Sequence, residues 1–485
     1  MTNTNNTGID PDYLFYPKSV AVVGASSDQS VLKASNLFIE GILKFGYQGK
    51  VYAVGATGGE VHGLNIYHNI RDIPDAVEYV ISSIPNTLVP QLVADCGEKG
   101  VKVLHLFTSG FSEIEDQIGK KLHDEVMRIA QQYEIRLLGP NCMGVYCPSS
   151  RFSFDSSFSS VAGKVGFLSQ SGGQSMMGIK EANQRGIYFS KVVSYGNAAD
   201  INECDLIEYL TDNTETDIIT AYIEGTNHGV RLLKALRKAT MRKPVVIFKG
   251  GDTEGGAQAA ISHTSSIAGS RLTWESLFRQ TGVIRVYNVQ EMFDVVSVLQ
   301  RCTEPQGLQT LIVGHGGGAG VQASDDCCRA GLRIPVLPPN LRQTLKRIYL
   351  SEAGNIFKNP LDINPFQGMD VATKAFAAVA DWNNADLIIL HSTPDEECFM
   401  PRSMEYQVII DTIMEWAKLS KNKPVLLVLN SNTVHGDDGL DEKSLKRMID
   451  AGFAAFPSTK RAAEAWFRVY QYYQWRNKHS TPISA

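Results

Sequence analysis

One histidine stands in a stretch of small residues near the middle of the chain, GGDTEGGAQAAISHTSSIAGS (Gly250–Ser270). The small neighbours of His263 are typical of a loop that brings an imidazole close to other backbone segments. An imidazole acts as a nucleophile toward phosphoryl groups when a partner fixes the tautomer of its other nitrogen. Glu224, at the end of the strand-like run Ala221–Gly225, has the type and the topological place of such a partner. The residues alone leave a simpler alternative, because a lone histidine is usually a surface group or a satisfied core group.

A second candidate is the small-residue turn formed by Ser171, Gly172 and Gly173, which follows an apolar run and precedes a predicted helix. Small residues leave the N–H groups of a first helical turn open, and the helix dipole favours an anion there. The pattern therefore indicates a phosphate-binding site, although serine and glycine also serve as ordinary helix caps. Gly316–Gly320 fits the same description, and we interpret that turn as structural.

A third small-residue turn, Gly24, Ala25 and Ser26, ends the first strand-like run. It predicts backbone amides that contact a phosphate at a helix N-terminus. A nicotinamide dinucleotide is disfavoured, because there is no GxGxxG motif and Gly55 stands where an acidic residue would bind the ribose hydroxyls. A different phosphate-bearing ligand is favoured, and the alternative is a turn glycine without a ligand.

The elements that must position these residues form one repeating pattern. Strand-like apolar runs alternate with amphipathic stretches along the whole chain, which is typical of α/β domains with parallel sheets. Since 485 residues are too many for one core, we expect three domains. They are a Rossmann-like domain over residues 1–147, a flavodoxin-like domain over 148–304 and a second flavodoxin-like domain over 305–485. The last two open alike, with a strand, a small-residue loop and a helix, which is weak support for an internal duplication.

The bulk composition argues against several classes of protein. A net charge of -5 without a Lys/Arg block gives no electrostatic footprint for nucleic acid. No run of about 18 apolar residues predicts a membrane span, and the polar start lacks the apolar centre of a signal peptide. Eight cysteines show no CxxC pair and no zinc-like spacing. We therefore expect reduced thiols, no bound metal and a cytoplasmic protein.

A series of segments from the first strand to the third domain carries a resemblance to a known family. The segments are AVVGAS, LFTSGFSE, LLGPNCMG, GFLSQSGG, VVSYGNAADI, AYIEGTNHG, AAISHTSSIAGS, GGGAGVQASDDC and NPLDI. Any one of them alone would be a weak signal, but their order and number are specific. The chain resembles, nearly end to end, the α subunit or α half of the ADP-forming acetyl-CoA synthetases, which are relatives of succinyl-CoA synthetase.

The resemblance implies a coenzyme A (CoA) site in the first domain and, in the second, a phosphohistidine at His263 supported by Glu224. By the same resemblance, the helix that begins near Ser171–Gly173 receives the phosphate. Acyl-CoA and phosphate then react reversibly through an acyl phosphate and phospho-His263, from which ADP takes the phosphoryl group. The residues that the resemblance assigns to CoA are Gly24, Ala25, Ser26, Lys33, Ser109, Gly110, Pro140 and Asn141.

Three departures from the family pattern stand out. Ser265 occupies a position that is often glycine, which stiffens the loop but keeps the nucleophile. The second strand ends Val54-Gly55-Ala56 instead of Val-Asn-Pro, at a place that concerns recognition of the CoA nucleotide. Nothing after residue 305 resembles an ATP-grasp domain. The resemblance therefore implies a separate ATP-grasp β-type subunit that binds ATP or ADP with Mg²⁺, in an α2β2 hetero-oligomer.

Two other classes of function compete with this interpretation. A CoA- or acyl-CoA-binding regulatory protein of the same fold, without catalysis, is disfavoured because both His263 and Glu224 are present. An NAD-dependent oxidoreductase is disfavoured by Gly55. The identity of the carboxylic acid (acetate, another short or branched acid, an aryl acid or a functionalised acid), the choice between ADP and GDP, and the physiological direction stay open at this point.

Overall fold

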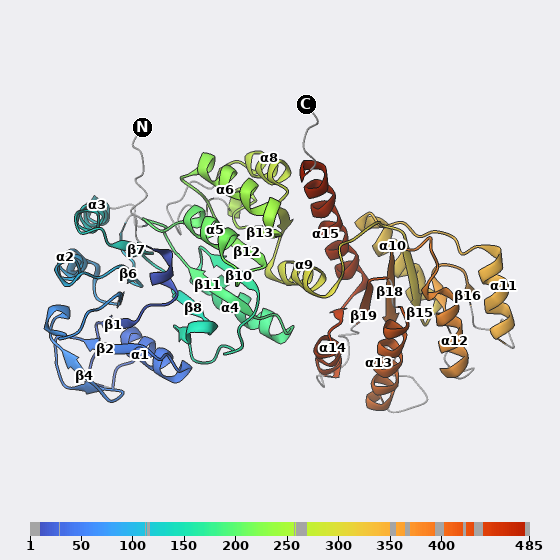
Figure 1. The fold of residues 1–485 in the computed structure, drawn as a ribbon, viewed down its shortest axis with the longest axis horizontal. Helices are drawn as coiled ribbons and strands as arrows, with labels where there is room; N and C mark the ends of the chain where they lie inside the picture. Colours follow the sequence, from blue (N-terminus) through green and yellow to red (C-terminus); the bar gives the residue numbers. More distant parts are fainter. Residues whose placement is uncertain are drawn as a thin grey trace. The chain divides into compact units, whose positions relative to one another are not determined.

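The computed structural model of the chain is shown in Figure 1. It describes residues 10–28, 30–111, 113, 117–256, 258, 269–349, 356–363, 369–392, 402–420, 423–430 and 440–480. The chain divides into two compact units, Met1–Asn183 with Tyr188–Val289, and Gln184–Ile187 with Gln290–Ala485. Within the described ranges, the first unit holds two seven-stranded sheets and the second unit holds one six-stranded sheet.

The first sheet consists of parallel strands in the order β4-β2-β1-β5-β6-β7, with the short β3 antiparallel at its edge. This is the 3-2-1-4-5-6 order of a Rossmann domain, as predicted. Its strands are β1 (Ser19–Val23), β2 (Lys50–Val54), β3 (Glu60–Val61), β4 (Leu64–Tyr67), β5 (Tyr79–Ser82), β6 (Val103–Leu106) and β7 (Arg136–Leu138). Its helices are α1 (Ala34–Phe45), α2 (Val89–Lys99) and α3 (Gln117–Gln132), with short 3-10 turns η1 (Pro11–Leu14), η2 (Ile70–Asp72) and η3 (Asn86–Leu88).

Alternation along β6 shows why helices cover both faces of the first sheet. Leu104 and Leu106 belong to the buried cluster that includes the apolar residues of α2 and α3. His105, between them, packs edge-on against Phe38 of α1. Figure 1 shows α2 and α3 side by side on one face of the sheet and α1 on the other. Because successive strand residues point to opposite faces, a strand that is apolar throughout needs a helix layer on each side.

The second sheet has the order β14-β13-β12-β10-β11-β8-β9. Its parallel part, β11-β10-β12-β13-β14, follows the 2-1-3-4-5 order of a flavodoxin-like domain. Its strands are β8 (Gly144–Cys147), β9 (Phe152–Ser153), β10 (Val165–Ser169), β11 (Phe189–Ser194), β12 (Ile218–Ile223), β13 (Val245–Lys249) and β14 (Ile284–Val286). The helical elements are η4 (Pro148–Ser150), α4 (Gly172–Gln184), α5 (Glu203–Asp212), α6 (Gly229–Arg242) and α8 (Arg271–Thr281).

The strand β8 joins the second sheet, where it pairs antiparallel with β11. The predicted boundary at residue 147 had placed this strand with the first domain. The stretch Pro148–Gly163, which the sequence indicated to be a connection, contains η4, β9 and three buried rings, Phe152, Phe154 and Phe158. The division into three domains at residues 147 and 304 stays a prediction.

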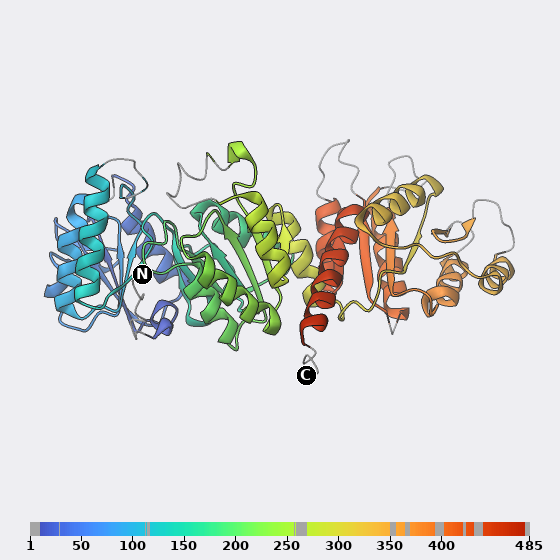
Figure 2. The same ribbon diagram turned by 90° about the horizontal axis from the view of Figure 1, so that it is seen from above.

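The sheet of the second unit has the order β16-β17-β15-β18-β19-β20, and its parallel part again follows the 2-1-3-4-5 order. Its strands are β15 (Thr310–Gly314), β16 (Ile356–Phe357), β17 (Leu361–Asp362), β18 (Leu387–Ser392), β19 (Val425–Leu429) and β20 (Ala454–Phe456). The helices are α9 (Val289–Arg301), α10 (Gly317–Ala330), α11 (Pro339–Ile348), α12 (Met369–Ala380), α13 (Arg402–Leu419), α14 (Leu440–Asp450) and α15 (Thr459–Ser480). Figure 2 shows α10 and α15 side by side. The α/β fold class with parallel sheets is confirmed.

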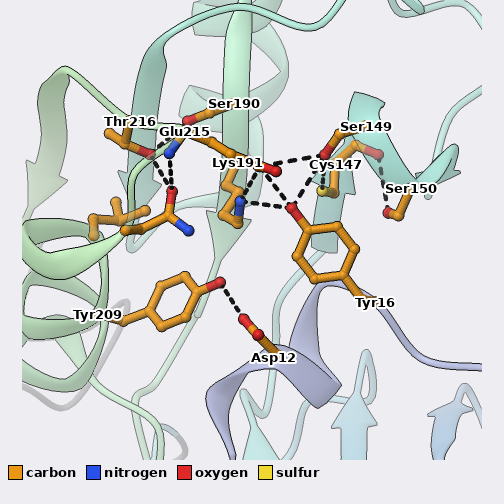
Figure 3. A network of polar contacts seen from close by, with 12 residues as sticks. Asp12, Tyr16, Cys147, Ser149, Ser150, Ser190, Lys191, Tyr209, Glu215 and Thr216 are labelled. Atoms are coloured by element: carbon orange, nitrogen blue, oxygen red, sulfur yellow. Dashed lines mark hydrogen bonds and ion pairs between the residues drawn. The ribbon is translucent and has the colours of Figure 1, made fainter.

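A buried lysine fastens the N-terminal segment to the second sheet (Figure 3). The side chain of Lys191, on β11, is fully buried, and its ammonium donates to Glu215 Oε2 at 2.6 Å and to the Tyr16 hydroxyl at 2.9 Å. The Tyr16 hydroxyl donates to the same carboxylate oxygen at 2.6 Å. Nearby, the Tyr209 hydroxyl donates to Asp12 at 2.7 Å. Removal of one partner from a buried ion pair lowers the stability of a fold by about 3–5 kcal/mol. This network therefore holds the segment before β1 against the second sheet.

Candidate active site

Glu224 lies at the carboxyl end of β12, with 5% of its surface exposed. The hydroxyl of Tyr222, two residues earlier on the same face of the strand, donates to Glu224 Oε1 at 3.1 Å. The backbone N–H groups of Glu224 and Gly225 donate to one oxygen, Gln170 Oε1, at 2.7 and 3.1 Å. The Lys249 ammonium donates to the Glu224 carbonyl oxygen at 2.7 Å. Both the backbone and the carboxylate of Glu224 are therefore held by residues of β12 and of the strands on either side.

The same glutamine links Glu224 to the predicted phosphate-binding turn. Gln170 directly follows β10, and its N–H donates to a carbonyl of β12 at 3.0 Å. Ser171 comes next, and α4 begins at Gly172 without an acidic residue in its first turn. Gly173 is exposed, and the nearest atom to a Cβ there would be the Ser171 hydroxyl at 3.9 Å. The structure thus brings the predicted turn to the edge of the second sheet where Glu224 lies.

His263 lies outside the described residues, but both ends of the segment that carries it are defined. Gly250 follows β13, and its N–H donates to the Ile223 carbonyl, directly before Glu224 in the chain, at 2.9 Å. The chain returns to the described fold at α8, which begins at Arg271. The segment that contains the predicted nucleophile therefore leaves the sheet beside Glu224.

Lys249 is buried at the base of this segment, with 4% of its surface exposed. Its ammonium donates to the carbonyls of Glu224 and Gly250 and lies 5.2 Å from the centre of the Trp274 ring. Burial lowers the pKa of Lys249 to about 8, although the carboxylates of Asp252 and Glu224 oppose that change. Because one amine contacts the ends of both strands, it holds β12 and β13 together where the histidine segment begins.

Two of the residues predicted for CoA line one cavity at the carboxyl edge of the first sheet. Ser109 and Asn141 contribute to a space of about 500 Å³ beyond β5, β6 and β7. The other lining residues are Ser83, Ile84, Pro85, Asn86, Phe107 and Thr108. Gly24 borders this group, because a Cβ there would lie 3.1 Å from the Ser83 hydroxyl. Ligands of doubly wound sheets bind beyond the carboxyl ends of the strands, so the location fits a ligand site.

The backbone N–H groups of the Gly24 turn are used within the protein. Those of Gly24 and Ala25 both donate to the Val54 carbonyl at 2.9 Å, and that of Ser26 donates to Asn36 Oδ1 at 3.2 Å. The expected use of these amides as phosphate donors is therefore not what this geometry offers. Contact of the three residues with CoA through other atoms stays a prediction. The turn leads into α1, whose N-cap residue makes no side-chain capping hydrogen bond.

Gly55 has a steric role in the same turn. A Cβ at this position would lie 2.0 Å from the Ala25 carbonyl oxygen, so any side chain would displace the turn. An acidic residue for ribose hydroxyls has no room here, which strengthens the argument against a nicotinamide dinucleotide. The departure Val54-Gly55-Ala56 thus has a structural cause in this chain.

Two other predicted residues, Gly110 and Pro140, have partners in neighbouring loops. The N–H of Gly110 donates to the Glu113 carboxylate, which also accepts the Asn197 side-chain amide at 2.7 Å. The carbonyl of Pro140 accepts the backbone N–H of Asn197 at 3.0 Å. These contacts join the cavity loops to the loop after β11. Lys33 lies apart from them, as the N-cap residue of α1.

Another cavity, of about 1000 Å³, contains none of the predicted site residues. It lies among η1, α5 and α6. Several of its charged lining residues pair with one another, as Arg231 does with Asp205 at 2.7 Å and Lys238 with Asp212 at 2.6 Å.

Sequence reasoning missed three residues that support Glu224, namely Gln170, Tyr222 and Lys249. All three belong to segments that the sequence singled out, but none was assigned a role. The available signal was a polar side chain in or directly after an apolar parallel strand, where burial demands a partner. Among the described residues, no group of three or more His, Cys, Asp or Glu residues is placed to hold a metal ion. In the same ranges, no helix combines the length and apolar character needed to cross a membrane.

Two domain families match this chain. The CoA binding domain matches residues 18–148, and the succinyl-CoA ligase like flavodoxin domain matches residues 162–299. The first range contains the first sheet and the cavity lined by Ser109. The second range contains most of the second sheet and Glu224. The fold and the two matched domains together define a CoA-binding protein of the succinyl-CoA ligase type.

Individual relatives narrow the class. The chain is 33% identical to the acetate–CoA ligase (ADP-forming) I subunit alpha of Pyrococcus furiosus, over 96% of this chain and 98% of that one. A solved structure, the dinucleotide forming acetyl-coenzyme A synthetase 1 of Candidatus Korarchaeum cryptofilum in complex with phosphate and ADP, has a TM-score of 0.83 at 30% identity. The match covers 98% of this chain and 99% of that chain. The chain belongs to the family of ADP-forming acetate–CoA ligase α subunits, within the succinyl-CoA synthetase superfamily.

Some relatives are much longer than this chain. The acetate–CoA ligase (ADP-forming) I of Archaeoglobus fulgidus is 35% identical over 79% of this chain, but the match covers 54% of that protein. The chain therefore spans nearly the whole of the Pyrococcus subunit and about half of the Archaeoglobus enzyme. The resemblance seen in the sequence is confirmed at the level of the family.

Proposed function

We propose that this chain is the α-type subunit of an ADP-forming acyl-CoA synthetase, which interconverts a carboxylic acid, CoA and ATP with acyl-CoA, ADP and phosphate. One observation carries the proposal. Glu224, the start of α4 and the base of the His263 segment meet at one edge of the second sheet. The cavity at the carboxyl edge of the first sheet, within the matched CoA binding domain, provides a place for the thioester.

The chemistry balances in both directions without an oxidant or a reductant. Toward ATP, an oxygen of phosphate attacks the thioester carbonyl, the C–S bond breaks and CoA leaves as its thiol. A ring nitrogen of His263 then attacks the phosphorus of the acyl phosphate, so that an N–P bond forms while the P–O bond breaks and the carboxylate leaves. Finally, a terminal oxygen of ADP takes the phosphoryl group and the free imidazole returns.

Each supporting residue has a task in this scheme. Glu224 accepts a hydrogen bond from the second imidazole nitrogen, fixes its tautomer and stabilises positive charge on the ring. The open first turn at Ser171, Gly172 and Gly173 stabilises the phosphoryl oxygens through backbone N–H groups and the helix dipole. Lys249 is a positioning residue, because it contacts the carbonyl of Glu224 and the base of the histidine segment.

For CoA, the proposal uses the cavity beyond the first sheet. The walls of this cavity contact CoA through Ser109, Gly110, Pro140 and Asn141. The Gly24–Ser26 turn closes one side of the cavity. The uncapped start of α1, together with the Lys33 ammonium, supplies donors and positive charge for the CoA phosphates. This assignment replaces the amides of the Gly24 turn as the expected phosphate donors.

The nucleotide site belongs to a partner in this proposal. No Walker-type GxxxxGK[ST] motif occurs in the sequence, and relatives of full coverage are named as alpha subunits. The partner is an ATP-grasp β-type subunit that binds ATP or ADP with Mg²⁺, and the assembly is an α2β2 hetero-oligomer in the cytoplasm. Mg²⁺ enters with the nucleotide phosphates.

Reconstitution tests the proposal. The purified chain, given ATP, Mg²⁺, CoA and a panel of carboxylic acids, is expected to form no thioester alone and to form one when the β-type subunit is added. ATP-dependent thioester formation by this chain alone would overturn the two-subunit scheme. If the complex binds CoA but forms neither phosphoenzyme nor any thioester, the protein is a CoA-binding regulator instead.

A further inference from the structure

An apolar cavity of about 300 Å³ lies between α1 and α4 in the first unit. Its apolar lining residues are Ala34, Leu37, Phe38, Gly41, Phe107, Met143, Phe154 and Met176. Glu40, Asp155 and Ser156 add the polar atoms, and the described lining contains no lysine, arginine or histidine. Walls rich in aromatic and methionine side chains are typical of a pocket for an apolar small molecule.

The cavity adjoins the two places that the proposed reaction uses. Phe107 lines both this cavity and the CoA cavity beyond the first sheet. Met143, on another wall, packs against the first residue of α4, since a Cβ at Gly172 would lie 2.8 Å from Met143 Cγ. The backbone N–H of Met143 donates to the Ser194 hydroxyl at 3.1 Å, which holds this wall in place. A group bound here therefore lies between CoA and the phosphate-binding turn.

Tight packing behind the lining makes the cavity preformed. Phe38, with 3% of its surface exposed, packs edge-on against Phe107 with ring centres 5.3 Å apart. Phe154, with 7% exposed, packs perpendicular to Phe158 at 5.3 Å. The backbone of α1 approaches this segment so closely that a Cβ at Gly41 would lie 2.8 Å from the Phe154 carbonyl oxygen. The shape is thus set by the fold and not by the ligand.

The charged groups of the lining disfavour a second carboxylate on the ligand. Glu40 pairs with the Lys44 ammonium, one helical turn further along α1. Asp155 Oδ1 accepts the backbone N–H of Ser157 at 2.8 Å. Both carboxylates remain acceptors and no cation stands opposite them in the described lining, so a dicarboxylic acid would meet repulsion.

We propose that this cavity receives the acyl group, and that the substrate is a bulky apolar monocarboxylic acid, aryl or branched, in preference to acetate or a dicarboxylic acid. The inference rests on the proposed function. A methyl group leaves most of about 300 Å³ unfilled, whereas a phenyl ring buries its faces against Phe38, Phe107 and Phe154. Added apolar contact of this kind favours the larger group.

Thioester binding to the chain alone tests the inference directly. Titration calorimetry compares three probes, phenylacetyl-CoA, acetyl-CoA and succinyl-CoA, with free CoA as the reference. Phenylacetyl-CoA is expected to bind with a Kd at least about tenfold lower than that of acetyl-CoA, and succinyl-CoA to bind more weakly than acetyl-CoA. Equal Kd values for phenylacetyl-CoA and acetyl-CoA, or tightest binding of succinyl-CoA, would overturn the inference.

Adjacent methionines on α4 provide a matched pair of variants. Met176→Trp fills the cavity and is expected to reduce the preference for phenylacetyl-CoA to less than about twofold, with the Kd of free CoA unchanged. Met177→Trp, at a position 51% exposed and outside the lining, is the control and keeps the preference. Met176→Ala enlarges the cavity and is also expected to keep the preference for phenylacetyl-CoA. This second variant keeps the test valid if the tryptophan variant does not fold. A retained preference in a folded Met176→Trp, or its loss in both tryptophan variants, would contradict the assignment.

The reconstituted complex separates this inference from the proposed function. Faster thioester formation with phenylacetate or 3-methylbutanoate than with acetate supports both. Thioester formation with acetate or succinate at a higher kcat/KM than with either bulky acid would overturn the acyl-group assignment and leave the synthetase function intact. Absence of thioester with every acid, despite bound CoA and an active partner, would overturn the proposed function itself.

Discussion

The second and third sheets share one strand order, but their carboxyl edges are built for different tasks. Both parallel parts run 2-1-3-4-5. In the second sheet, the strand ends lead into Gln170, Glu224 and Lys249, and the first and last of these hold the backbone of Glu224 while the Tyr222 hydroxyl donates to its carboxylate. A carboxylate held in this way can orient a nucleophile that approaches from the next loop.

The third sheet has a buried histidine where the second has Tyr222, since His391 pairs with Gly314 at the end of β15 as Tyr222 pairs with Ser169 at the end of β10. His391, near the end of β18, has 3% of its surface exposed, and a Cβ at Gly314 would lie 2.4 Å from its Nε2. Asp362 Oδ1 accepts the N–H of Gly316 at 3.0 Å, just before α10. The interpretation of Gly316–Gly320 as a structural turn stays a prediction. The shared strand order therefore produces two similar carboxyl edges, and the residues at the strand ends determine the chemistry of each edge.

The largest expected effect comes from the carboxylate that distinguishes the two edges. Glu224→Gln keeps the side-chain shape but removes the charge, so it should slow phosphorylation of the complex by about 10²–10⁴-fold. Rapid-quench measurement of the phosphoenzyme gives the rate. Glu208→Gln on α5, a partly exposed carboxylate that pairs with Arg231, is the control and should stay within about twofold of wild type. A wild-type rate in Glu224→Gln would assign the orienting role to another group.

Lys249 should make the first unit more stable as the pH rises from about 8 to 10.5. Burial lowers its pKa to about 8 from an ordinary 10.5, so in this window the unfolded chain binds more protons than the folded one. The free energy of unfolding therefore increases with pH here, by up to about 3 kcal/mol from this group. Urea titrations of wild type and Lys249→Met test it. If the difference in unfolding free energy between wild type and variant does not change from pH 8 to 10.5, the lowered pKa of the buried amine is contradicted.

His391 should also make the protein more stable as the pH rises, but it lies in the second unit and acts in a lower pH range. Burial, and to a smaller extent the charge of His315, lowers its pKa to about 4 from an ordinary 6.5. Between pH 6.5 and 4 the unfolded chain binds the extra proton, so stability falls as the pH falls, by up to about 3 kcal/mol. His391→Gln should remove that slope in urea titrations. Equal slopes in wild type and variant would show that the ring is protonated in the fold.

The smallest effect is expected from one hydroxyl. Tyr222→Phe removes the hydrogen bond to Glu224 Oε1 while the ring keeps its contact with Phe248. Loss of one hydrogen bond with a net contribution of about 0.5–1.5 kcal/mol should slow phosphorylation about two- to tenfold. Tyr133→Phe, at a tyrosine directly after α3 with 36% of its surface exposed, serves as the control. A loss as large as that of Glu224→Gln would mean that the tyrosine itself touches the reacting atoms.

Much of the fold could be predicted from the sequence because apolar runs such as Val165–Ser169 and Thr310–Gly314 are fully buried parallel strands. The alternation of such runs with amphipathic helices indicates three doubly wound sheets. The short antiparallel strands β8 and β9 could not be predicted in the same way. Their stretch is rich in serine and phenylalanine, has no regular period, and is defined by pairing with β11, a distant part of the chain.

The place of Glu224 beside the base of the His263 segment could be predicted from strand position, while its role stays a prediction. The sequence could not predict whether hydrogen bonds within the protein already use a backbone N–H that a ligand would need. The amides of Gly24 and Ala25 look open in the sequence, but both donate to Val54, a partner that only the paired strands bring near. The role of Lys249 was hidden for the same reason, since its acceptors lie on two strands.

Phosphate on His263 is the most direct test of the account. The chain is incubated with its β-type partner, Mg²⁺ and labelled ATP, and the product is mapped by mass spectrometry. The account predicts one acid-labile, base-stable phosphate on His263 that ADP removes, and none in His263→Ala, which should still bind CoA with the wild-type Kd. Labelling of another residue, or full synthetase activity in His263→Ala, would contradict it.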